Sequence, residues 1–212
     1  MVACGVALPP ALSALDGEII YTEGTVTVSG NSGTRDAGPG AKISAGDKVA
    51  TEADSLAIID LSNATQIKLL ERTSLVITAV GDNTQVSLSA GALFSRIVGK
   101  LAGGFSVRAD NAIAGVRGTE FFIAYGKTVD GQRDIWLCVN SGVVEVSIPS
   151  ENQEVQVPAG KGIDVIGGAK LTPPRGYLWT RKLNWNMDPS NGSVEDHTSM
   201  DQYNDLLNHD YN

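Results

Sequence analysis

An alternation of apolar and polar side chains with a period of two residues is the feature that most restricts how this chain folds. It begins at Val26 and Val28 and recurs in several later runs, which include residues 85–89, 143–148 and 154–157. A strand with one face in a core and the other in water produces this pattern. The 24 glycines are spread among the runs and mark turns between short strands. We therefore predict an all-β fold, either a sandwich or a short β-helical roll of many short antiparallel strands.

The alternation ends near residue 166, which predicts four segments. Residues 1–17 are expected to be a signal-like or disordered N-terminal segment, and residues 18–166 the β domain. Residues 167–187 form an aromatic-rich capping segment. Residues 188–212 form an acidic tail with at most one short helix, because no Lys or Arg follows Lys182. A length of 212 residues with 42% hydrophobic content is enough for one principal core.

Charge and hydropathy argue against a nucleic-acid partner and against a membrane-spanning helix. The formal net charge is −8, whereas nucleic-acid surfaces are built from clustered Lys and Arg, so we expect no nucleic acid. No stretch reaches the roughly 20 apolar residues of a spanning helix, so we expect no transmembrane span. The Ala-rich start has small residues that resemble the later part of a secretion signal.

The two cysteines have dissimilar surroundings and do not predict a disulfide. Cys4 follows small residues, as at the end of a lipoprotein signal, so Cys4 is a candidate for lipidation. Cleavage near Ala14, or no processing, are the alternatives. Cys138 lies in a strand pattern and is expected to be a small buried hydrophobe.

Catalytic groupings are not evident in the predicted core. Both histidines, His197 and His209, lie in the tail, which leaves the β core without an imidazole for a catalytic triad or a metal site. We therefore predict no catalytic residue, no cofactor, no metal and no enzymatic activity. Carboxylate pairs cannot be located from sequence, so an unrecognised hydrolase stays open as a further hypothesis.

Three aromatic residues lie in the segment of residues 167–187. Tyr177, Trp179 and Trp185 could stack on sugar rings as a glycan platform, or they could cap the core. Polysaccharide is therefore a candidate ligand.

The sharpest local signature lies in residues 105–123. Gly115 and Gly118 permit close backbone approach or a positive φ between two strands. Arg117 and Glu120 are placed to form a charge pair at that turn. The segment is either a structural corner of the sheet or a recognition edge.

At these residues the chain resembles the FecR-type domain family, named after a ferric-citrate regulator. Five pieces occur in the family's order, and they cover roughly residues 24–165. They are a Gly-Asp segment with a strand-edge Thr, a hairpin at residues 55–69, a Leu-x-x-Gly strand start, a Gly-Thr-x-Phe motif and a Gly-x-Val strand. The motif positions are Gly46, Asp47, Thr51, Gly91, Arg117, Gly118, Thr119, Phe121 and Gly142.

The resemblance implies an extracytoplasmic domain that takes part in signalling across the bacterial envelope. A membrane helix and a cytoplasmic segment, which the full-length regulators have, are absent from this sequence, so we expect a stand-alone form. Residues 62–65 also depart from the usual Asp-Gly turn. The resulting hypothesis is a periplasmic or extracellular domain, secreted or held by a lipid anchor, that binds another envelope or outer-membrane protein without turnover. A glycan or peptidoglycan-binding module and a structural envelope protein are the alternatives.

Overall fold

The computed structural model describes residues 17–61, 64–97, 103–116, 118–129, 132–177, 180 and 182–196. It is nearly all β, with 61% of residues in strands and 4% in helical turns, which confirms the predicted fold class. The strands form one continuous hydrogen-bonded network that does not close into a barrel. Within the described residues, none of the helical segments has the length and hydropathy that a bilayer crossing requires.

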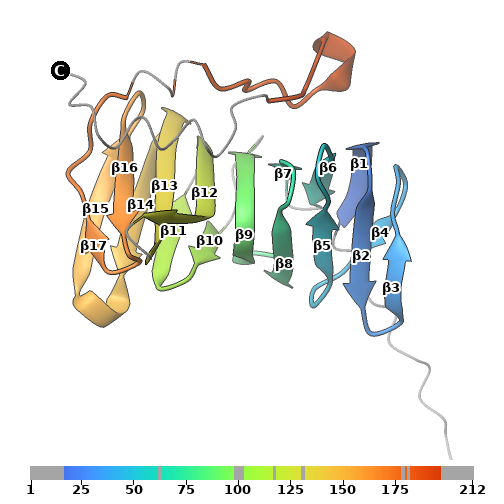
Figure 1. Ribbon diagram of the computed structural model, residues 1–212, viewed down its shortest axis with the longest axis horizontal. Coiled ribbons are helices and arrows are strands. Elements are labelled where there is room, and N and C mark those ends of the chain that lie inside the picture. Colours follow the sequence, from blue (N-terminus) through green and yellow to red (C-terminus); the bar gives the residue numbers. More distant parts are fainter. Residues whose placement is uncertain are drawn as a thin grey trace, which may run out of the picture.

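The network is folded into two stacked layers, which lie above one another in Figure 1. Layer A contains, in spatial order, β4 (Lys42–Ile43), β1 (Gly17–Glu23), β6 (Leu56–Leu61), β7 (Thr65–Leu69), the second half of β9 (Thr84–Ile97), β12 (Glu120–Val129), β13 (Gln132–Ser141), β16 (Gly162–Ile166) and β17 (Lys170–Leu171).

Layer B repeats this arrangement with different strands. It contains β3 (Gly33–Asp36), β2 (Val26–Gly30), β5 (Lys48–Thr51), β8 (Ser74–Ala79), the first half of β9, β10 (Phe105–Ala109), β11 (Ala112–Val116), β14 (Val143–Ile148) and β15 (Gln153–Pro158). A short 3-10 turn, η1 (Pro149–Glu151), joins β14 to β15. The pairing of β9 with β10 is parallel, whereas the other pairings are antiparallel as predicted.

Strand β9 belongs to both layers, and Gly91 marks the crossing. Residues before Gly91 pair with β8 and β10, and residues from Gly91 onward pair with β7 and β12. Gly91 has a φ of +88°, and a Cβ built there would lie 2.5 Å from the Cα of Thr73. Only glycine fits this backbone. The sequence pattern placed a strand start at Gly91, whereas the structure places the residue inside one long strand.

The main core fills the space between the two layers. Alternate residues of each layer point inward, for example Val86 and Leu88 from layer B and Ile123 and Leu137 from layer A. This arrangement is what the two-residue period predicted.

The outer face of layer A is also covered. The C-terminal strap (residues 182–196), which contains the 3-10 turn η3 (Pro189–Asn191), runs along that face on the upper side in Figure 1. Its buried side chains Leu183, Met187 and Val194 pack against a second apolar cluster that includes Phe94 and Phe122. Much of layer A is therefore buried on both faces.

Candidate functional site

The family-motif positions at the start of the domain stabilise turns and strand ends. Gly46 has a φ of +94°, and the carboxylate of Asp47 accepts a hydrogen bond of 3.0 Å from the backbone N–H of Ser44, which closes that turn. The hydroxyl of Thr51 is buried, and it donates to the carbonyl of Leu70 at 2.5 Å. It also accepts from the N–H of Thr73 at 3.0 Å.

Two further motif pieces pack directly on one another. Gly142 has a φ of +82°, and a Cβ built there would lie 3.1 Å from the carbonyl oxygen of Gly118 and 3.2 Å from the Cα of Thr119. The Thr119 hydroxyl donates to the carbonyl of Val143 at 3.3 Å. The Gly-Thr-x-Phe motif therefore holds the start of β14, the strand that follows Gly142, in position.

Phe121, the last residue of that motif, is fully buried between the layers, and its ring centroid lies 6.3 Å from that of Phe105. Arg117 and Cys4 lie outside the described residues. The described motif side chains thus serve the turns and the core, and Phe121 presents none of its surface to solvent.

The structure describes two of the three aromatic candidates. Tyr177 and Trp185 are partly buried and pack against the second apolar cluster, and the Trp185 ring meets Phe94 edge-on at a centroid distance of 5.1 Å. Trp179 lies outside the described residues.

A buried lysine fastens the strap to layer A. The Lys68 side chain on β7 is fully buried, and its Nζ donates to three strap carbonyls: Asn184 at 2.5 Å, Asn186 at 2.9 Å and Val194 at 3.1 Å. Its Nζ also lies 4.2 Å from the centroid of the Phe94 ring. Burial lowers the pKa of Lys68 to about 8.

Arg96 on β9 holds the strap at a second point. Its guanidinium donates to the carbonyl of Trp185 at 2.9 Å and to the carboxylate of Glu120 at 2.7 Å. The Glu120 carboxylate in turn accepts from the side-chain amide of Asn140.

Two buried acids lie on the same outer face, near β16. Asp164 is 5% exposed, and its Oδ1 has no hydrogen-bond partner among the described residues. Asp134 is 1% exposed and accepts from the N–H of Gly167 at 2.7 Å. Burial, followed by the charge of Asp134, raises the pKa of Asp164 to about 7. No group of three metal-ligating side chains is present among the described residues.

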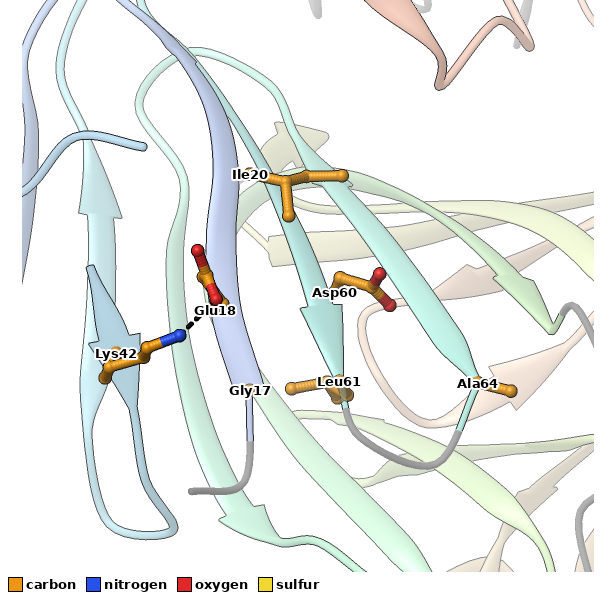
Figure 2. Close-up of a pocket in the computed structure, with 7 residues that line it drawn as sticks. All are labelled: Gly17, Glu18, Ile20, Lys42, Asp60, Leu61 and Ala64. Carbon is orange, nitrogen blue, oxygen red and sulfur yellow. Dashed lines mark hydrogen bonds and ion pairs between the residues drawn. The ribbon is translucent and has the colours of Figure 1, made fainter. Parts of the chain in front are cut away.

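An open hollow of about 430 Å³ lies at the β1 end of layer A, beyond the strap (Figure 2). It is lined by Gly17, Glu18, Ile20, Lys42, Asp60, Leu61 and Ala64. Lys42 pairs with Glu18, and Asp60 lies on the strand beside them. Ile20 is the extra residue of a β-bulge in β1 and is 38% exposed. Sequence patterns did not predict this hollow, because its residues come from three strands and from Ala64 in the turn before β7, and the register of these elements is not visible in the chain.

A second open feature is a polar trough on the outer face of layer B, with a volume of about 810 Å³. Its floor includes one cross-strand row, which is Gln85, Ser106, Gly115, Glu145 and Gln156. Gly115 has no side chain, and the nearest atom to a Cβ built there is 3.9 Å away, so the middle of the row is hollow.

This geometry defines a two-layer, open β domain whose motif residues support its turns and core. The FecR family model, described as FecR protein, matches residues 47–145, which confirms the resemblance that the sequence motifs indicated. FecR domains are components of envelope signalling. A comparison with curated proteins gives no match.

Two solved structures share this fold. Both are crystal structures, at 1.65 and 2.50 Å resolution, of a candidate anti-sigma factor from Parabacteroides distasonis ATCC 8503. Each is 17% identical to this chain and superposes with a TM-score of 0.52. The match covers 61% of this chain and 59% of the other. The similarity supports the architecture and spans little more than half the length of those proteins.

Proposed function

We propose that this protein is a non-catalytic FecR-type domain, located outside the cytoplasm, that regulates envelope signalling by binding another envelope or outer-membrane protein. The family match and the fold shared with a candidate anti-sigma factor support a regulatory role. The inward placement of motif residues such as Phe121 and Thr51 is consistent with a scaffold. A scaffold of this kind acts through its surface.

The observation that carries the proposal is the open edge of β1. Strand β4 pairs with β1 at Gly17 and Glu18, and residues 40–41 just before β4 exchange backbone hydrogen bonds with Ile19, whereas β6 pairs along the length of β1. In the described part of the chain, no strand lies beside Tyr21 to Glu23 on the side away from β6. An edge of this kind offers backbone N–H and C=O groups to an incoming strand.

A photo-crosslinking amino acid at Thr22, on this edge, tests the proposal in intact cell envelopes. Glu151, exposed in η1 near the opposite end of layer B, provides the matched control position. We expect a discrete adduct with one envelope protein from position 22 and none from position 151. Equal adducts from both positions, or none from position 22, would contradict the proposal.

Binding of a polysaccharide is a second candidate function, favoured by the trough on layer B. Serine, glutamine and glutamate side chains can exchange hydrogen bonds with sugar hydroxyls, and Gly115 leaves room between them. Retention of the protein on purified peptidoglycan should fall in Gly115→Gln, which fills the trough. Unchanged retention in that variant would exclude the trough as the binding surface, and the Tyr177, Trp179 and Trp185 platform would then be the remaining glycan hypothesis.

A lipid anchor at Cys4 remains part of the proposal for localisation. Mass spectrometry of the mature protein from its natural host distinguishes an acylated Cys4 from cleavage near Ala14 and from an unprocessed start. Substitution Cys4→Ser should move the protein from the membrane fraction to the soluble envelope fraction if Cys4 is acylated.

A further inference from the structure

The outer face of layer A carries a row of charged and polar side chains that passes through the hollow of Figure 2. The strand register sets the row in the order Lys42, Glu18, Asp60, Gln66, Arg96, Glu120. Two of its three acids have cations beside them, because Lys42 pairs with Glu18 and Arg96 pairs with Glu120. Asp60 is the exception. Among the described residues, its carboxylate takes part in no ion pair or hydrogen bond.

The position of Asp60 is electrostatically unfavourable in the free protein. It lies directly opposite Glu18 in an antiparallel pair, and like charges at such positions repel. Partial burial, followed by the charge of Glu18, raises the pKa of Asp60 above its usual value. A cation supplied from outside would favour the ionised form of Asp60 and so offset the effects of burial and of the Glu18 charge.

The hollow also offers apolar surface next to this acid. The β-bulge of β1 turns Ile20 outward, so that the side chain lies beside the Asp60 carboxylate, as Figure 2 shows. Bulges often serve to redirect one side chain at a functional position. A flexible aliphatic stem that ends in a positive charge fits both features, with the stem on Ile20 and the head on Asp60.

We infer that this hollow binds an arginine or lysine side chain of a protein partner, with Asp60 as the counter-ion and Ile20 as the apolar contact. This inference rests on the proposed function and extends it, because the hollow adjoins the open edge of β1. The formal net charge of −8 favours approach by a basic surface. A resident divalent metal fits less well, because such ions require several oxygen ligands and one of the two acids is already paired with Lys42.

Binding of a small probe to the purified protein tests the inference directly. The probe is N-acetyl-arginine methylamide, and its matched control is the citrulline analogue, which has nearly the same shape without the charge. We expect the NMR signal of the Ile20 methyl group to shift with saturating millimolar binding for the arginine probe and to stay unchanged for citrulline. Equal shifts from both probes would overturn the inference.

Substitutions then assign the roles of the two residues. Asp60→Asn should weaken binding of the arginine probe about three- to fivefold, as expected for loss of a partly exposed ion pair, and Ile20→Ser should also weaken it. Glu154→Gln, which removes an exposed acid on β15 of layer B, should leave the affinity unchanged. Circular dichroism should show that all three variants are folded. Probe binding that does not respond to Asp60→Asn would overturn the assignment of Asp60.

The same variants separate this inference from the proposed function. If the adduct from position 22 forms in the wild type and persists at full yield in Asp60→Asn, partner binding stands and the role of the hollow fails. If the arginine probe binds as expected but position 22 gives no adduct, the hollow is a cation site and the proposed edge interaction fails. Loss of the adduct in Asp60→Asn, with retention in Glu154→Gln, supports both.

Discussion

The ammonium group of Lys68 donates a hydrogen bond of 2.9 Å to the backbone carbonyl of Asn186, and this contact joins residues that are 118 positions apart in the chain. Lys68 makes two more bonds of this kind, to the carbonyls of Asn184 and Val194. One side chain on β7 thereby holds three points of the strap against layer A.

Lys68→Met is expected to lower the free energy of unfolding by about 3 kcal/mol, because hydrogen bonds to a charged group are lost and buried strap carbonyls are left without a donor. Urea denaturation measures the change. The control is Lys48→Met, which replaces an exposed lysine on β5 and should change the stability by less than about 0.5 kcal/mol. Equal stability of the two variants would contradict the role of Lys68.

Arg96→Gln is expected to loosen the strap with a smaller loss of global stability. The substitution removes the bond to the carbonyl of Trp185 and the ion pair with Glu120. Limited trypsin digestion should therefore cleave after the exposed Lys182 several times faster than in the wild type. Arg108→Gln, on the outer face of layer B, should leave that rate unchanged.

Asp164 is expected to make the stability decrease as the pH rises from about 4 to about 7. Its pKa is about 7 in the folded protein and 3.8 ordinarily, so in this range the folded state binds more protons than the unfolded state. The stabilising contribution of the protonated acid is present below pH 4 and is lost as the pH passes through 7. Asp134 lies on the same face and contributes to the shift, and Tyr177 and Arg175 are close by.

Asp164→Asn should remove this part of the pH dependence and stabilise the protein at pH 8 by about 2 kcal/mol or more, because the buried side chain at position 164 no longer has to ionise. Thermal denaturation from pH 4 to pH 8 provides the measurement. Asp36→Asn, at an exposed position on β3, should retain the wild-type slope. A slope that is the same in Asp164→Asn and in the wild type would show that Asp164 ionises normally.

Gly142→Ala is expected to cost more stability than Gly160→Ala. Both glycines have a similar positive φ, +82° and +77°, so both substitutions carry the same backbone strain. A Cβ at Gly142 would also press against the backbone of Gly118 and Thr119, whereas at Gly160 nothing lies within 4 Å. We expect a difference of about 1 kcal/mol or more in chemical denaturation. Equal losses would show that this approach of the two motif segments has no energetic consequence.

The amino-acid sequence by itself determined the class of fold and its turns. The two-residue period in runs such as residues 143–148 is a local property of a strand with one buried face, and β14 forms there. The hairpin expected at residues 55–69 is present as β6 and β7. The motif glycines also follow from local geometry, because a positive φ at Gly46 or Gly142 favours that residue type in any context.

Only the tertiary structure decided which outward-facing residues are exposed. In the run of residues 65–69, Lys68 occupies a polar position of the alternation and would be expected to face water, yet the strap covers it completely. Asp60 lies on the same face of layer A beyond the strap and lines an open hollow. Periodicity along a strand tells which side a residue is on, but burial of that side depends on a segment more than a hundred residues away. The sequence also could not reveal which acids lack a neighbouring cation, because the strand register of the folded protein sets the cross-strand neighbours.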